Sequence, residues 1–189
     1  ILGSSLKENY EALSGDIRAY DVRTGKQRWT FHTIPRPGEF GFDTWSEESY
    51  KNIGGSNAWA GLSIDRKRGL VFAATGAPAF DFHGGERKGS NLFANSIIAM
   101  NAATGKYVWH FQTSHHDLWD YDLPTPPNLT TIKKDGDEID VVVQITKQGL
   151  VFIMERETGK PIYPIEERPV PPSTMTDESA WPTQPFPTK

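Results

Sequence analysis

The sequence predicts an all-β chain assembled from the blades of a β-propeller. The segment from Ala19 to Trp29 recurs from Ala99 to Trp109, and a third, more divergent copy runs from Met154 to Tyr163. Each copy is an extended run that enters a Thr-Gly-Lys turn and leaves as a second strand carrying an aromatic residue. Helical periodicity is nearly absent. One such turn would be an ordinary β-turn, whereas three copies with the same flanks indicate stacked β-sheet units.

The number of blades follows from the length of the repeat. Residues 64–74 form a further hairpin of the same style, from Ile64 to Ala74. Propeller repeats take roughly 40 to 50 residues per blade, so a chain of this length makes about three to four blades. A closed ring typically has about four to eight. We therefore expect residues 1–168 to be part of a longer propeller, and residues 169–189, rich in Pro and Thr, to form an extended segment that docks on the missing part.

Composition excludes several classes of function. The 189 residues carry a formal net charge of −4 with a pI near 5.7, which leaves no basic footprint for nucleic acid. There is no cysteine, so disulfides, thiolate metal sites and cysteine nucleophiles are absent. No apolar run approaches the roughly 20 residues that span a bilayer, and no signal peptide is visible. The chain opens on Ile1 without an initiator Met, as though it entered in the middle of a strand. Hydrolase motifs and a nicotinamide-binding Gly-x-Gly-x-x-Gly are missing.

Chemistry is concentrated in the loop of residues 114–124. This loop holds three carboxylates, two imidazoles and an indole: His115, His116, Asp117, Trp119, Asp120 and Asp122. Prolines at 124, 126 and 127 exclude a helix. A carboxylate beside an aromatic wall can act as a general base or cation ligand. The alternative is a solvated acidic turn, in which Asp117 and Asp122 would matter little. The two histidines are adjacent and point to opposite sides of an extended segment, so they cannot both face one site.

Several of these motifs together resemble one family. They are Gly54–Gly61 with its Trp59, then Asp65 and the strand from Leu70 to Gly76, and finally His115–Pro124. In this combination the chain resembles the pyrroloquinoline quinone (PQQ) dependent dehydrogenases, from Gly3 to about Pro172. The resemblance implies an eight-bladed propeller that oxidises alcohols or sugars in the periplasm.

The resemblance also implies roles for residues near the N-terminus and around Trp59. Ser5 matches a serine that holds a carboxylate of the cofactor, and Glu8 matches a ligand of a divalent cation. Trp59 matches the tryptophan that forms the floor beneath the planar quinone, a natural use of a broad, rigid indole. Trp59 lies outside the repeat, whereas Trp29 and Trp109 belong to the repeat and are expected to be structural.

Further roles fall on the acidic loop and on one lysine. Asp120 matches the catalytic carboxylate of the family, which also binds the cation, and Lys147 matches a cation that contacts the reactive quinone carbonyl. A hard cation, Ca²⁺ or Mg²⁺, suits such oxygen ligands. In the alcohol-oxidising branch an Asn that supplies a metal oxygen stands where this chain has Ala77. Either the shell is completed by a backbone carbonyl, by water or by Asn57, which is also a candidate cofactor contact, or the site binds metal weakly.

The implied function is oxidation of an alcohol or sugar hydroxyl, with hydride passed to PQQ, Asp120 as base and the cation as Lewis acid. The sequence of residues 115–120 favours a glucose-dehydrogenase-like branch, and so does Ala77, which stands where the alcohol-oxidising branch has an Asn. The expected partners are the substrate, the remainder of the propeller and an electron acceptor, cytochrome c or ubiquinone, that is not encoded here. The alternative is a non-catalytic propeller that serves as a binding scaffold. Such a scaffold has no reason to hold Glu8, Trp59, Asp120 and Lys147 together.

Overall fold

The computed structural model describes residues 1–9, 12–46 and 48–189. Strands dominate this part of the chain, and the helical elements are a single turn each, η1 (Phe42–Thr44) and α1 (Ser49–Asn52). The prediction of an all-β propeller fragment without long helices is confirmed. No helix among the described residues is both long enough and apolar enough to cross a bilayer.

A four-stranded antiparallel sheet occupies the middle of the molecule. It consists of β3 (Leu62–Asp65), β4 (Leu70–Ala74), β5 (Ser96–Asn101) and β6 (Tyr107–Gln112), paired in that order. Strands that follow one another in sequence are therefore neighbours in space, the arrangement of a complete propeller blade. Every residue of β4 is buried, because sheets pack on both of its faces.

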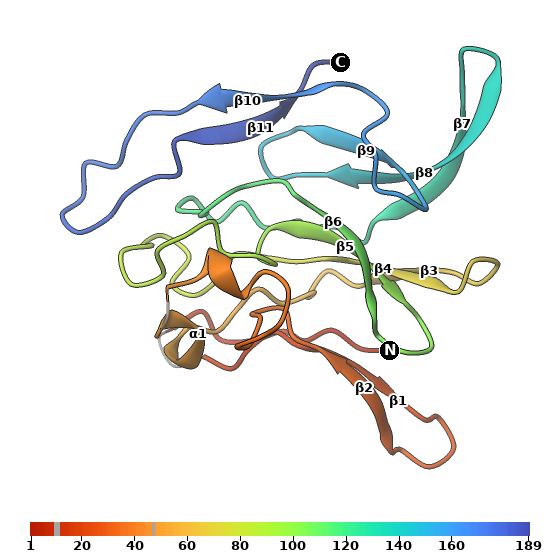
Figure 1. Ribbon diagram of the computed structural model, residues 1–189, viewed down its shortest axis with the longest axis horizontal. Helices are drawn as coiled ribbons and strands as arrows, with labels where there is room; N and C mark the ends of the chain where they lie inside the picture. Colours follow the sequence, from red (N-terminus) through yellow and green to blue (C-terminus); the bar gives the residue numbers. More distant parts are fainter. Residues whose placement is uncertain (10–11, 47) are drawn as a thin grey trace.

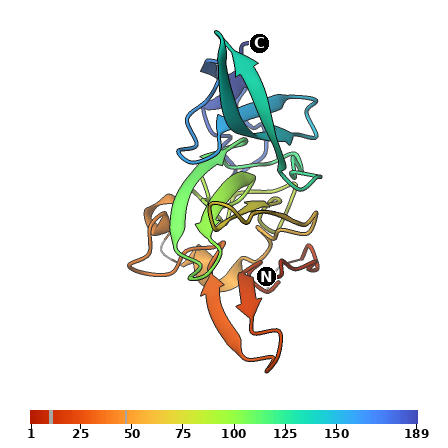
Figure 2. The same ribbon diagram turned by 90° about the vertical axis from the view of Figure 1, so that its right-hand side faces the viewer.

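Three further sheets flank the central one. On one side β1 (Ile17–Tyr20) pairs with β2 (Gln27–Phe31), and on the other β7 (Asn128–Lys134), β8 (Asp137–Ile145) and β9 (Val151–Glu155) form a three-stranded sheet. The last pair is β10 (Ile165–Pro169) with β11 (Thr183–Pro187), so the Pro- and Thr-rich segment contains a strand that pairs back onto residues 165–169. The sheets follow one another in sequence order from bottom to top in Figures 1 and 2.

The core lies in two layers, one on each face of the central sheet. Alternate residues of a strand point to opposite faces, so neighbouring residues of β4 and β5 enter different layers. The layer shared with β1 and β2 contains Ile17, Trp29, Phe31, Val71, Ala73, Ile98 and Met100. The layer shared with β8 and β9 contains Leu70, Phe72, Ala74, Ile97, Ala99, Trp109, Val142, Phe152 and Met154.

The repeated Thr-Gly-Lys segments form tight turns, as the sequence predicts. They join β1 to β2 and β5 to β6, and the third follows β9. In the first turn Asp21 Oδ1 accepts hydrogen bonds from Thr24 N (2.9 Å) and Thr24 Oγ1 (3.0 Å), and Gly25 has a φ of 69°. Asn101 plays the part of Asp21 in the second turn, with the same contacts to Thr104. An Asx side chain and a left-handed glycine thus fix the first two of these turns.

A tryptophan of one repeat binds to the turn of the next, as expected for structural residues. Trp29 Nε1 donates to the carbonyl oxygen of Ala102 (3.2 Å), and Trp109 Nε1 donates to that of Arg156 (3.0 Å). We call these two contacts the tryptophan locks. Because each lock crosses from one sheet to the following one, it fixes the spacing of successive sheets.

The glycines of these turns make room for the indoles. A Cβ built on Gly105 would lie 2.5 Å from the ring of Trp29, and one on Gly159 would lie 2.6 Å from the ring of Trp109. Both contacts are shorter than any real Cβ tolerates, so the locks require glycine for space as well as for its positive φ.

A buried carboxylate also joins the central sheet to the third. Asp65 accepts hydrogen bonds from the guanidinium of Arg68 (3.0 Å) and from that of Arg156 (3.1 Å), and Arg68 continues to Asp140 (2.7 Å). Although burial acts in the opposite direction, the bonds from the Arg68 backbone N–H and from both guanidinium groups lower the pKa of Asp65 to about 2.

The topology sorts the connections onto two edges. In an antiparallel sheet, every second connection lies on the same edge. The short turns β1–β2, β3–β4 and β7–β8 point to the right in Figure 1, whereas the long connections, including the one that holds α1, lie at the left. The connections before β1, before β3, after β4, before β7 and after β8 all share this second edge, which we call the loop edge.

Candidate functional site

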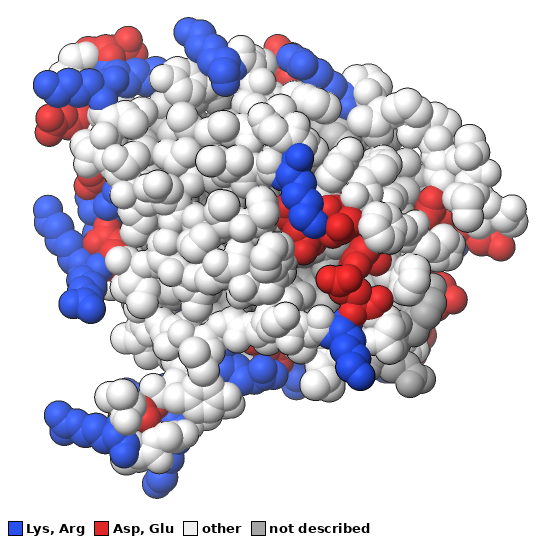
Figure 3. Space-filling model, turned by 180° about the vertical axis from the view of Figure 1, so that it is seen from behind, with Lys and Arg blue, Asp and Glu red and all other residues white. Residues whose placement is uncertain are grey.

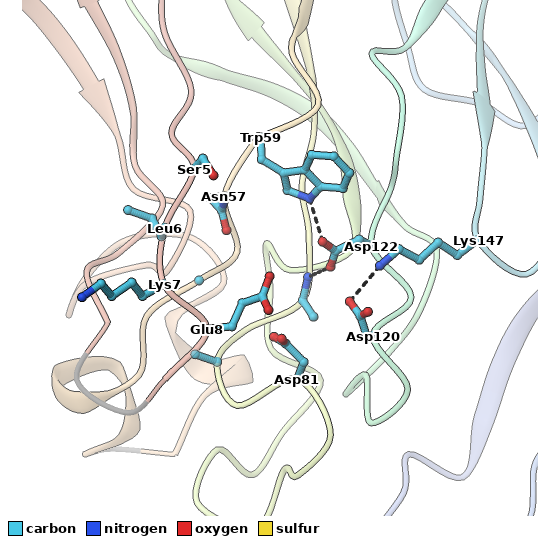
Figure 4. Close-up of a pocket in the computed structure, with 13 residues that line it drawn as sticks. Ser5, Leu6, Lys7, Glu8, Asn57, Trp59, Asp81, Asp120, Asp122 and Lys147 are labelled. Atoms are coloured by element: carbon cyan, nitrogen blue, oxygen red, sulfur yellow. Dashed lines mark hydrogen bonds and ion pairs between the residues drawn. The ribbon is translucent and has the colours of Figure 1, made fainter.

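A cavity of about 290 Å³ opens at the loop edge. All of the connections assigned to that edge contribute to it, although they are far apart in sequence (Figure 4). Its lining consists of Ser5, Leu6, Lys7, Glu8, Gly55, Asn57, Trp59, Ala77, Ala79, Asp81, Asp120, Asp122 and Lys147. The six site residues predicted from the sequence, Ser5, Glu8, Asn57, Trp59, Asp120 and Lys147, all belong to this lining. Their individual roles remain predictions.

The indole of Trp59 is held by its edge. Trp59 Nε1 donates to Asp122 Oδ2 (2.6 Å), and the other oxygen of Asp122 accepts the backbone N–H of Ala77 (2.5 Å). Gly76 lets the carboxylate approach, because a Cβ there would lie 2.7 Å from both oxygens. The indole retains 43% exposure, so it can offer a face to a planar ligand.

This contact overturns the interpretation of Asp122 as a solvated residue. The side chain is 9% exposed, and it fixes the orientation of Trp59. Burial raises the pKa of the Asp122 carboxyl above its ordinary value, although the hydrogen bonds from Ala77 and Trp59 act against the shift. A carboxylate with both oxygens committed to backbone and indole donors is a poor candidate for a mobile base. Its position beside the cavity nevertheless adds negative charge there.

Asp120 and Lys147 form an ion pair on the side of the cavity opposite Glu8 (Figure 4). Lys147 Nζ lies 2.8 Å from Asp120 Oδ1, and each side chain keeps about a third of its surface exposed, 34% for Lys147 and 33% for Asp120. Burial alone would lower the pKa of Lys147, but the hydrogen bond to Asp120 and the charge of Asp122 raise it above its ordinary value. Lys147 is therefore a permanent cation within reach of a partly open carboxylate.

A fourth carboxylate, Asp81, lies on the cavity wall beside Glu8 (Figure 4). Burial, together with the charges of Glu8, Asp122 and Asp120, raises the pKa of Asp81 to about 7. Sequence reasoning did not single out this residue, because no spacing motif marks it. Its place in the chain could have identified it. Asp81 follows β4, and because connections alternate between the two edges of the sheet, it lies on the same edge as Trp59 and Asp120.

Asp117, also considered as a solvated residue, is completely buried instead. Its oxygens accept the backbone N–H groups of Trp119 (2.9 Å) and Tyr121 (2.6 Å) and the side-chain N–H of Asn95 (2.8 Å). Burial raises the pKa of Asp117 to about 6, although the two backbone donors act against this shift. Asp117 does not line the cavity.

Neither histidine of the acidic loop lines the cavity. His116 is buried, and its Nδ1 lies 2.7 Å from the carbonyl oxygen of Gly89. Burial, then the charge of Arg87, lowers the pKa of His116 to about 4. His115 turns toward the last pair of strands, where its backbone N–H donates to Gln184 Oε1 (2.7 Å). The structure thus brings neither of these two candidates to the cavity.

The charges of the cavity suit a cation. The lining contains four carboxylates and two lysines, which leaves two negative charges when all are ionised, the charge that one divalent cation neutralises. Figure 3 shows acidic side chains gathered on this face with a basic side chain on either side of them. Oxygen donors fit a hard cation such as Ca²⁺ or Mg²⁺. No three acidic, His or Cys side chains of the described residues converge closely enough to enclose an ion, so a cation here needs further oxygen ligands.

The comparisons with known proteins agree with this geometry. The family model of the PQQ-type glucose/ethanol/alcohol dehydrogenase β-propeller domain matches residues 1–189. The chain is 42% identical over 180 residues to quinoprotein glucose dehydrogenase A of Acinetobacter calcoaceticus, an alignment that covers 90% of this chain and 22% of that protein.

Two solved structures have the same fold. A quinohemoprotein alcohol dehydrogenase of Pseudomonas putida superposes with a TM-score of 0.71 at 34% identity, over 81% of this chain and 25% of the other. A europium-containing methanol dehydrogenase gives a TM-score of 0.70 at 25% identity, over 89% and 33%. This chain thus spans a quarter to a third of these structures and under a quarter of the glucose dehydrogenase. The chain belongs to the PQQ-dependent glucose/ethanol/alcohol dehydrogenase β-propeller family.

Proposed function

We propose that this chain carries the cofactor- and cation-binding edge of a PQQ-dependent dehydrogenase that oxidises an alcohol or sugar hydroxyl. One observation carries the proposal: a half-exposed indole, a carboxylate paired with a lysine, and further carboxylates reach one cavity from separate connections. A binding scaffold would gain nothing from placing an ion-paired carboxylate and several further ones around a flat aromatic surface.

The residues fit the planar cofactor at two places. Trp59 presents its face to the cavity while Asp122 holds its edge, so the indole is oriented before any ligand arrives. Lys147 and Ser5 line the same cavity and offer donors to the carbonyl and carboxylate oxygens of a quinone acid. When bound, PQQ supplies the hydride acceptor, chemistry that no amino-acid side chain provides.

The divalent cation would rest on Glu8 and Asp120. Both line the cavity, and Asp81 lies beside Glu8. Ala77 contributes no side-chain oxygen, and Asn57 already donates its Nδ2 to the carbonyl oxygen of Ser4 (2.8 Å). Because that bond leaves Asn57 Oδ1 available, the remaining ligands of a six- to eight-coordinate Ca²⁺ would come from Asn57 Oδ1, the cofactor, water, backbone carbonyls or Asp81.

Asp120 is the base in this proposal. Its carboxylate is one-third exposed, so a substrate hydroxyl can approach it from solvent. Lys147 Nζ lies 2.8 Å from Asp120 Oδ1 and keeps that oxygen in place. The carboxylate lone pairs that neither Lys147 nor the cation uses would accept the hydroxyl proton as the substrate carbon loses hydride. Asp122, with both oxygens occupied, positions the indole and takes no proton.

The substrate, the partners and the compartment are part of the same proposal. A relative at 42% identity is a glucose dehydrogenase, which favours a sugar as substrate. We propose that the remaining blades of the ring come from the rest of a longer protein, that cytochrome c or ubiquinone accepts the electrons, and that oxidation takes place in the periplasm.

Reconstitution of the full-length protein tests the proposal. Apo protein is mixed with PQQ and Ca²⁺, and the absorbance of the bound quinone is followed during titration. We expect saturable binding that needs both additions. Trp59→Ala should weaken it about 5- to 150-fold, since stacking on one aromatic is worth roughly 1 to 3 kcal/mol. Trp181→Ala, a tryptophan outside the cavity lining, is the control. Absence of quinone binding by the folded protein would favour the scaffold function.

A further inference from the structure

We propose that Asp117 is the positioning residue of Asp120: its buried carboxylate fixes the backbone on both sides of Asp120 and so aims that side chain into the cavity. The inference rests on the proposed function, in which Asp120 takes the substrate proton. It assigns a role to a side chain that touches neither substrate nor cofactor.

The hydrogen bonds of Asp117 bracket Asp120 in the chain. Asp117 Oδ1 accepts the N–H of Trp119 (2.9 Å), and Asp117 Oδ2 accepts the N–H of Tyr121 (2.6 Å). These are the residues immediately before and after Asp120. A carboxylate that binds two backbone N–H groups makes charge-assisted bonds, which are stronger than bonds between neutral groups. The direction of the Cα–Cβ bond of Asp120 is thereby set.

Asp120 needs such support because its backbone is strained. Its φ is 59°, in the left-handed region that residues other than glycine rarely adopt. A strained conformation of this kind persists only where the surrounding structure over-determines it. Its own ion pair with Lys147 is a third exposed on each side, and pairs of that exposure contribute little to holding a loop. The buried bonds to Asp117 are the stronger restraint.

Asp117 itself is anchored in the interior. Asn95 Nδ2 donates to Asp117 Oδ2 (2.8 Å), and the buried Arg87 donates to the carbonyl oxygen of Asp117. Arg87 also donates to Asn91 Oδ1 (3.0 Å). All these partners lie in the connection between β4 and β5. The central sheet therefore anchors Asp117 and, through Asp117, the backbone of Asp120.

An exchange of the side chains at positions 117 and 95 separates positioning from folding. In Asp117→Asn, the amide group has one oxygen for two backbone donors, and its NH₂ faces the NH₂ of Asn95. In the double variant Asp117→Asn/Asn95→Asp, the buried charge and the contact between the two side chains are restored. One N–H beside Asp120 still loses its acceptor, because the amide introduced at position 117 must donate to the carboxylate introduced at position 95. The double variant should therefore fold, yet fail to hold Asp120.

The experiment uses the full-length protein with PQQ and Ca²⁺. Thermal unfolding, the absorbance of bound PQQ, kcat and KM are measured for the wild type, Asp117→Asn and the double variant. We expect the double variant to unfold cooperatively at a higher temperature than Asp117→Asn and to keep the wild-type PQQ affinity, while kcat falls about 10- to 100-fold with KM little changed, because small misplacement of a reacting group costs up to about 100-fold. A kcat within about twofold of wild type would overturn the inference, since the misplacement would then carry no cost.

A crystal structure of the variant gives a readout independent of activity. The distance from Asp120 Oδ1 to Lys147 Nζ, 2.8 Å in the wild type, is expected to exceed the 4.0 Å limit of an ion pair. An unchanged distance, or failure of both variants to fold, would assign Asp117 to stability alone. Asp120→Asn is the comparator: if it keeps full turnover, the proposed role of Asp120 is wrong, whereas the crystallographic distance still tests the positioning by Asp117.

Discussion

Replacement of Gly159 by alanine should disrupt the second tryptophan lock. The resulting loss in the free energy of unfolding can be measured separately from the cost of a left-handed alanine. Gly159 has a φ of 72°, and a Cβ there would lie 2.6 Å from the ring of Trp109. Gly149 has nearly the same backbone conformation, with a φ of 76°, but a Cβ there meets nothing within 4 Å. Gly149→Ala therefore measures the cost of the left-handed conformation alone, about 1 to 2 kcal/mol.

The difference between the two variants is the cost of displacing the indole. Overpacking typically costs about 1 to 3 kcal/mol. Movement of Trp109 also weakens its hydrogen bond to the carbonyl oxygen of Arg156, a net contribution of about 0.5 to 1.5 kcal/mol. We expect Gly159→Ala to be about 1.5 to 4.5 kcal/mol less stable than Gly149→Ala, the sum of these two costs.

Urea unfolding followed by far-ultraviolet circular dichroism measures both free energies of unfolding. The first lock supplies an independent pair, because a Cβ on Gly105 lies 2.5 Å from Trp29 whereas one on Gly25 meets nothing. Their φ angles are 71° and 69°. Equal losses within each pair would refute the idea that the indoles hold successive sheets together through these turns.

The other predictions concern charges. Asp120→Asn should lower kcat by roughly 100- to 10,000-fold, as loss of a general base does, without lowering the melting temperature; near-normal turnover with saturating PQQ and Ca²⁺ would contradict this. Asp81→Asn should weaken Ca²⁺ binding by about 10-fold in calorimetry, since charge count tunes affinity, whereas Asp137→Asn, an exposed carboxylate outside the cavity, should not. The pKa of Asp65 is lowered to about 2 from 3.8, so its contribution is complete above pH 3.8 and is lost as pH falls toward 2. The free energy of unfolding should drop by about 2 kcal/mol over that range, and Asp65→Asn should remove this slope.

The sequence was sufficient for the fold because the repeat carries its own turn chemistry. Asp21 with Gly25, and Asn101 with Gly105, define hairpins from local contacts, so the strands beside them could be placed without knowledge of the rest. Residues 128–134, the strand β7, were not predicted. Most of that strand is exposed and polar, so it has neither an apolar run nor a tight turn at its start.

The resemblance was enough to predict six of the residues that line the cavity. It did not predict the different environments of the three carboxylates in the acidic loop. Asp117, Asp120 and Asp122 lie in one turn and look equivalent in sequence. They differ because their partners lie far away in the sequence. Asn95 donates a hydrogen bond to the buried Asp117, and Trp59 donates one to Asp122. Asp120 pairs with Lys147 and stays one-third exposed. Burial and pairing of this kind are tertiary properties, so no local pattern reports them.

The spread of the cavity lining along the chain has a consequence for biosynthesis. Along the chain Ser5 is the first and Lys147 the last of the residues that line the cavity, with two complete sheets and the first two strands of the third between them. Sheets that contact only their neighbours can fold one after another as they emerge. The cavity is therefore finished only when the third sheet docks. A ligand that bridges Glu8 and Lys147 would recognise the completed stack and would not bind a nascent chain that had folded only two sheets.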